Sequence, residues 1–126
     1  MKSYTDIEQS KKLAEILPLE SADMHYKVNR HNNESKIFMI PYSELGYYKD
    51  NDYQYTVCAW SLAALLVILA KIASKIDDDG SADLSSFMGQ WSVNMLDCPV
   101  QATDNYDSAV DACVEMIIKL NELNLL

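Results

Sequence analysis

One stretch of the chain is apolar at nearly every position: residues 59–70 read AWSLAALLVILA. The run predicts a helix that begins at Ser61, whose hydroxyl suits an N-cap, and continues to about Ile76. A helix that is hydrophobic on nearly every face is buried, so we expect the rest of the chain to wrap around it. The apolar run 59–70 is too short to span a bilayer, which needs about 20 residues. Three leucines should be almost fully buried: Leu65, Leu66 and Leu69.

The charge balance disfavours two classes of partner. The chain has 126 residues, a length typical of one domain, and its formal net charge is -9. Nucleic-acid phosphates and anionic membranes both attract clustered Lys and Arg, which an acidic chain lacks. We therefore expect no direct binding to nucleic acid and no membrane association.

The cysteines and the N-terminus indicate a cytoplasmic location. Cys58, Cys98 and Cys113 are an odd and widely spaced set, which favours reduced thiols over a disulfide framework or a zinc site. The first residues contain no apolar run of the kind found in secretion signals. These features predict a cytoplasmic protein.

Other elements are predicted from periodicity and capping signals. Thr5 and Glu8 have the spacing of a capping box, which predicts a first helix that ends before Pro18. The alternation over residues 87–95 predicts the clearest strand, with Phe87, Trp91 and Val93 inside. Shorter strands are expected at 26–28, 36–41 and 53–57, a hairpin over 97–103, and a last helix from Asp107 or Ser108 to Glu122.

Together these elements predict a single α+β domain over residues 1–126. We expect an antiparallel sheet of about four or five strands. The two main helices, 61–76 and 107–122, should cover this sheet, with the N-terminal helix at its edge.

Three blocks of the sequence carry a resemblance to a known family. They are Ser21-Ala22-Asp23-Met24, residues 60–66 (Trp-Ser-Leu-Ala-Ala-Leu-Leu), and residues 107–117, which include Asp-Ala-Cys-Val-Glu-Met-Ile. In this order they resemble a family of short proteins from gut Bacteroides-type bacteria and their phages. The resemblance covers almost the whole chain, although Cys58-Ala59 stands where the family often has a proline before Trp-Ser. It implies a small intracellular protein, often carried on mobile or phage-derived DNA, and it implies no activity.

Three clusters of ligating or titratable side chains each have a simpler explanation than catalysis or metal binding. They are His25 and His31 with Asp23, the run Asp77–Asp79 with Asp83 around Gly80, and the set Asp104, Asp107, Asp111 and Glu115. The histidines lack zinc-site spacing, and the consecutive aspartates lack the alternation of a calcium loop. Acids near the start of a helix suit its dipole. We therefore expect no catalytic residue, no metal ligand and no cofactor.

The best candidate for a binding surface is a tyrosine-rich segment. Tyr47 and Tyr48 lie beside Asp50 and Asp52 in residues 43–55, where no periodicity would bury the two adjacent tyrosines. Tyrosine is enriched at interfaces because it combines an apolar body with a polar tip. We expect Tyr47 and Tyr48 to be exposed and this segment to contact a protein partner.

The sequence favours a small non-catalytic binding or accessory protein over two alternatives. One alternative is an acidic mimic of nucleic acid that inhibits a DNA-binding enzyme, for which the net charge of -9 is modest. The other is a small enzyme, which would need a pocket with convergent polar groups. The partner's identity and the oligomeric state stay open, a homodimer included.

Overall fold

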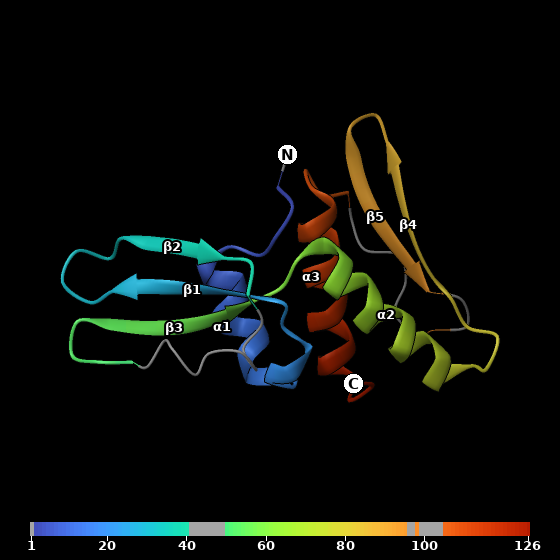
Figure 1. The fold of residues 1–126 in the computed structure, drawn as a ribbon. Coiled ribbons are helices and arrows are strands. Elements are labelled where there is room, and N and C mark those ends of the chain that lie inside the picture. The colour runs from blue at the N-terminus through green and yellow to red at the C-terminus, as the bar shows by residue number, and fades with distance from the viewer. Residues whose placement is uncertain (1, 41–49, 96–97, 99–104) are drawn as a thin grey trace. The chain divides into compact units, whose positions relative to one another are not determined.

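The computed structural model describes residues 2–40, 50–95, 98 and 105–126. These residues form helices and antiparallel strands, which confirms the α+β class (Figure 1). In chain order the elements are α1 (Ile7–Ile16), the 3-10 helix η1 (Leu19–Ser21), β1 (Met24–Asn29), β2 (Ser35–Phe38), β3 (Gln54–Ala59), α2 (Leu62–Ile76), β4 (Ala82–Phe87), β5 (Gln90–Met95) and α3 (Ala109–Glu122).

The strands form two sheets and not one sheet of four or five. The first sheet has the order β2-β1-β3, and the second consists of β4 and β5. The chain divides into two compact units, Tyr4–Ser61 and Leu62–Leu126 with Met1–Ser3. Each sheet belongs to one unit. No helix among the described residues is long and apolar enough to cross a membrane.

In the first unit, α1 begins one residue later than the sequence predicts. Asp6, not Thr5, is the N-cap: the Gln9 amide donates to Asp6 Oδ1 at 2.8 Å, and the Asp6 amide donates to Gln9 Oε1 at 3.1 Å. This is a complete capping box with Gln9 in the place expected for Glu8. The helix ends at Ile16, before Pro18, as predicted.

Thr5 is buried and joins α1 to the end of β3. Its amide donates to the Trp60 carbonyl at 2.9 Å, and the Trp60 amide donates to Thr5 Oγ1 at 3.1 Å. The Tyr26 hydroxyl donates to the Thr5 carbonyl at 2.7 Å. Because its hydroxyl is committed to Trp60 and to Ser10, Thr5 leaves the helix cap to Asp6.

The three-stranded sheet has one apolar and one polar face. The apolar face carries a cluster of buried side chains from β1 and β3: Met24, Tyr26, Val28, Val57 and Ala59. Ile7 of α1 and Ile37 of β2 pack against this cluster. Alternation along β1 places His25, Lys27 and Asn29 on the opposite face. The strand expected at 36–41 is observed as the edge strand β2, in which Ser35 and Lys36 are exposed.

In the second unit, α2 is buried along one stripe and not wrapped on all sides. Leu65 and Leu69 are fully buried, as predicted, whereas Leu66 is only half-buried. Val67, on the opposite side, is 53% exposed. The expectation of a helix buried all round is therefore wrong: small and aliphatic side chains on its outer side remain in contact with solvent.

The last helix follows the sequence closely. Ser108 caps α3, and its Oγ accepts a hydrogen bond from the Asp111 amide at 3.0 Å. The apolar stripe of this helix is buried throughout: Val110, Cys113, Val114, Ile117 and Leu120. Lys2 Nζ lies 2.7 Å from Asp111 Oδ1 in the first turn of the helix.

The segment 87–95 is not one continuous strand: it contains the end of β4, a turn and the strand β5. Met88 and Gly89 form a two-residue turn between β4 and β5, with φ values of 52° and 80°. Two consecutive positive φ values are typical of a type I′ turn. Val93 is buried as predicted, but Phe87 lies next to the turn and is 78% exposed, so its predicted burial is wrong. Most of the hairpin predicted over 97–103 lies outside the described residues.

Gly80, after α2, is required for space and not for a left-handed turn. A Cβ at this position would lie 2.3 Å from the Ala73 carbonyl oxygen and 2.8 Å from the Asp77 carbonyl oxygen. Both neighbours are backbone atoms that cannot rotate away. The predicted end of the helix is correct, but its reason is close backbone approach.

Candidate functional site

The structure describes half of the predicted partner surface. Asp50 and Asp52 are both exposed, and Tyr47 and Tyr48 lie outside the described residues. Asp50 Oδ1 accepts a hydrogen bond from Thr56 Oγ1 at 2.8 Å and lies 4.0 Å from Lys27 Nζ. Asp50 is therefore attached to the polar face of the three-stranded sheet. That the whole segment contacts a partner stays a prediction.

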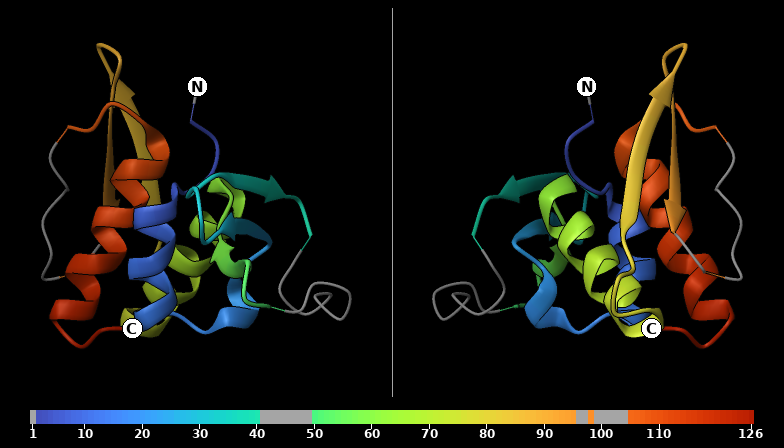
Figure 2. Two further views of the ribbon diagram at one scale, coloured as in Figure 1. Left: turned by 90° about the vertical axis from the view of Figure 1, so that its left-hand side faces the viewer. Right: turned by 90° about the vertical axis from the view of Figure 1, so that its right-hand side faces the viewer.

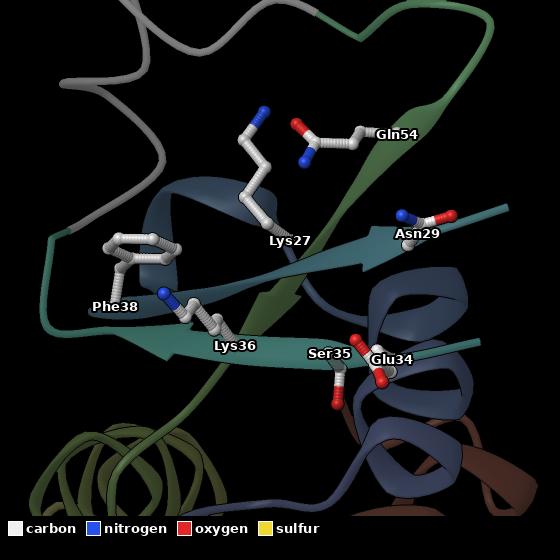
Figure 3. A pocket seen from close by; sticks show the side chains of 7 residues that line it. All are labelled: Lys27, Asn29, Glu34, Ser35, Lys36, Phe38 and Gln54. Atoms are coloured by element: carbon white, nitrogen blue, oxygen red, sulfur yellow. The ribbon is translucent and has the colours of Figure 1, made fainter. Parts of the chain in front are cut away.

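A pocket of about 580 Å³ lies on this polar face. It is lined by residues from all three strands and from the turn before β2: Lys27, Asn29, Glu34, Ser35, Lys36, Phe38 and Gln54. Figure 3 shows the side chains of Lys27, Phe38 and Gln54 on the same side of the sheet. The volume falls in the range of small-molecule sites. We call it the polar pocket.

Two lysines on neighbouring strands lie at one end of the polar pocket. Lys27 and Lys36 are direct partners in the antiparallel register of β1 and β2. Lys27 is only 9% exposed, and its Nζ donates to Thr56 Oγ1 at 2.8 Å. Lys36 is exposed. Like charges directly opposite each other in a sheet are unfavourable, so this end of the pocket favours a negatively charged group.

The other end of the polar pocket carries an acid. Glu34 precedes β2, and its carbonyl accepts a hydrogen bond from the Asn29 amide at 2.8 Å. Figure 3 shows Glu34 and Asn29 together at the opposite end from Phe38. The pocket is therefore polarised along β2, with Lys36 and Glu34 two residues apart.

Phe38 is held in place by His25. The two rings are stacked, with centroids 5.1 Å apart and an interplanar angle of 10°. His25 is fully buried, and its Nδ1 donates to the Ile40 carbonyl at 2.8 Å. This histidine thus positions an aromatic wall of the pocket.

His25, His31 and Asp23 make separate contacts in the structure. Asp23 accepts hydrogen bonds from the Ser61 amide, at 2.8 Å, and from the Ser61 hydroxyl. His31 is exposed and lies beside Tyr53, with ring centroids 5.3 Å apart. Over the described ranges, no three His, Cys, Asp or Glu residues are grouped so that they could hold a metal ion.

Burial makes two of the cysteines poor nucleophiles. All three cysteines are free, and Cys58 and Cys113 are buried. Desolvation raises the pKa of the Cys58 thiol, and it raises the pKa of Cys113 from 9.0 to about 12. A buried thiol with a raised pKa holds its proton at neutral pH, and the thiol is far less nucleophilic than the thiolate.

These raised pKa values predict that the protein becomes less stable in alkali. Burial, with smaller contributions from Tyr4 and Asp6, also raises the pKa of Tyr26 from 10.0 to about 12. Above about pH 9 the unfolded chain releases these protons while the folded chain retains them, so the free energy of unfolding falls as the pH rises toward 12. Urea denaturation at a series of pH values measures this decline. Cys113→Ala should flatten it between pH 9 and 10, and a constant urea midpoint from pH 8 to 11 would contradict the burial of both groups.

A second candidate surface is the tip of the β4–β5 hairpin, formed by Phe87 and Met88. Phe87 is 78% and Met88 87% exposed, although both are large and apolar. In Figures 1 and 2 this hairpin tip extends beyond the ends of α2 and α3, the helices of the same unit. Sequence reasoning missed the hairpin tip because the alternation of 91–95 was extended back through Gly89. A glycine between two alternating segments was the available signal for a turn.

The comparisons with known proteins identify no relative: no family model matches the chain, and neither curated proteins nor solved structures give a match.

Proposed function

We propose that this chain is a small non-catalytic cytoplasmic protein that binds a protein partner through the hairpin tip. In accordance with the sequence resemblance, we place it among phage-derived or mobile-element proteins. The observation that carries the proposal is the exposure of two adjacent apolar side chains, Phe87 and Met88. Exposed apolar anchors that protrude from a rigid element are typical of contact sites.

The backbone at the hairpin tip supports a functional reason for Met88. Its φ of 52° lies in the left-handed region, which Asn and Gly adopt readily and other residues adopt at a cost of about 1–2 kcal/mol. Methionine is thus a poor choice for folding at this position. A residue that disfavours its own turn and exposes its side chain is better explained by a contact with another molecule.

The outer edge of β4 offers a second element of recognition. Within the described part of the chain, β4 pairs with β5 alone. An open strand edge can accept an extended segment of a partner through main-chain hydrogen bonds. Such a segment would end beside Phe87, which is the last residue of β4.

Replacing Met88 by asparagine separates folding from binding. Asparagine tolerates positive φ, so Met88→Asn should raise the free energy of unfolding by about 1 kcal/mol, measured by urea denaturation. The same change should weaken partner capture. If Met88→Asn lowers stability, the hairpin tip is not strained, and this argument for a functional methionine is wrong.

Site-specific photo-crosslinking tests the proposed contact. A benzophenone side chain at position 87 should give a discrete adduct with one protein when the chain is expressed in its natural host. The control carries the same group at position 67 of α2, where Val67 is also large, apolar and 53% exposed. Identical adduct patterns from positions 87 and 67 would show that exposure alone, and not the hairpin tip, determines capture.

A further inference from the structure

The charges of the polar pocket suit a ligand that carries opposite charges at its two ends. Lys27 and Lys36 lie opposite each other at one end, and Glu34 lies at the other end beside Asn29. Two residues along a strand separate Lys36 from Glu34, a distance of about 7 Å between their Cα atoms. We propose that this pocket binds a small linear zwitterion of dipeptide size, with its carboxylate at the lysines and its ammonium at Glu34.

Lys36 is the residue that this ligand would engage most strongly. Lys27 already donates to Thr56 Oγ1 at 2.8 Å and has Asp50 Oδ1 at 4.0 Å, so part of its charge is balanced. Among the described residues no acidic side chain pairs with Lys36. A carboxylate bound beside Lys36 would form a charge-assisted hydrogen bond with its ammonium group, and Lys27 would add positive charge at the same end of the pocket.

The size of the pocket and its amide side chains favour a peptide over other zwitterions. Two extended residues span about 7 Å, a length similar to the Cα–Cα separation of Lys36 and Glu34. Asn29 and Gln54 also line the pocket, and their side-chain amides can both donate to and accept from a peptide group. Phe38, stacked on His25, provides an apolar wall at the lysine end. This binding function is independent of the hairpin tip.

The matched probes are glycylglycine and 5-aminopentanoate, which have the same chain length and the same charged ends but differ in the central amide. Titration into the full ¹⁵N-labelled chain should shift the backbone amide signals of Asn29, Lys36 and Gln54. Glycylglycine should bind several-fold more tightly than 5-aminopentanoate. Equal binding of the two would assign the site to ω-amino acids and overturn the peptide assignment. Pentanoate lacks the ammonium group. Tighter binding of pentanoate than of glycylglycine would overturn the proposal that the ligand is a zwitterion.

Charge variants test each end of the ligand separately. Lys36→Gln should weaken glycylglycine and pentanoate alike by about tenfold, because both carry a carboxylate. Glu34→Gln should weaken glycylglycine and leave pentanoate unchanged or improved. Lys71→Gln on α2 is the matched control, since Lys71 is equally exposed and its loss changes the net charge by the same amount. All three positions are exposed, so thermal melts should show intact folds. An equal effect of Lys36→Gln and Lys71→Gln, or no probe binding at tens of millimolar, would overturn the proposal.

Discussion

Replacing Leu65 with alanine is expected to lower the free energy of unfolding by about 2–5 kcal/mol. Leu65 is fully buried on the inner stripe of α2. The lost side chain would leave a cavity that the surrounding helices can fill only partly. Urea denaturation monitored by circular dichroism measures the change.

The neighbouring leucine is the control for this prediction. Leu66 has the same chemistry and the same helix propensity, but it is only half-buried. Leu66→Ala should therefore lower the free energy of unfolding by clearly less than Leu65→Ala, by about 1–2 kcal/mol. An equal or greater loss from Leu66→Ala would mean that α2 is buried on the face that the structure leaves half-exposed.

Thr5→Val should lower the free energy of unfolding by about 1–3 kcal/mol. Valine has nearly the same shape, but it leaves the buried Trp60 amide without the acceptor that Thr5 Oγ1 provides at 3.1 Å. The change acts at the hydrogen bonds that join the chain before α1 to the residue after β3. The same denaturation experiment measures it.

Thr5→Ser separates the hydroxyl from the methyl group. Serine keeps the acceptor for Trp60 and loses one methyl, which should lower stability by about 1 kcal/mol. Thr5→Val should be the more harmful of the two. The opposite order would show that packing at Thr5 matters more than its hydrogen bond.

The helices were predictable where local signals and tertiary packing agree. The inner stripe of α3 and its Ser108 cap follow from sequence, because apolar spacing and capping both indicate the same helix. The cap of α1 was placed one residue early because Thr5 has the right chemistry for a cap. Its hydroxyl is instead used by Trp60, a residue 55 positions away, and local spacing contains no information on such a contact.

The strands were harder to predict because their partners are distant in sequence. The alternation along β5 continues in register through Gly89 to Phe87, so the period alone could not show that the chain reverses at Met88-Gly89. Met88 also contradicts the residue preference of the turn that it forms. The presence of Met88 is therefore one reason why the sequence did not predict the turn, and it is also a reason to regard the hairpin tip as a candidate binding surface.

The polar pocket could not be foreseen either, although its residues are visible in the sequence. Lys27 and Lys36 face each other only because β1 and β2 pair in one register, and a shift of one residue would move either lysine to the apolar face. Asp50 was proposed as a partner residue, and its hydrogen bond to Thr56 places it at the rim of this polar face.

The most direct test of the hairpin tip as a binding surface is the affinity of the crosslinked partner for a double variant, Phe87→Ser with Met88→Asn. Both changes lie on exposed side chains, and the asparagine suits the turn, so the variant should unfold at the same or a higher urea concentration. We predict that the dissociation constant rises at least tenfold, because both apolar anchors are lost. A stably folded double variant that binds the partner as tightly as the natural chain would contradict the account.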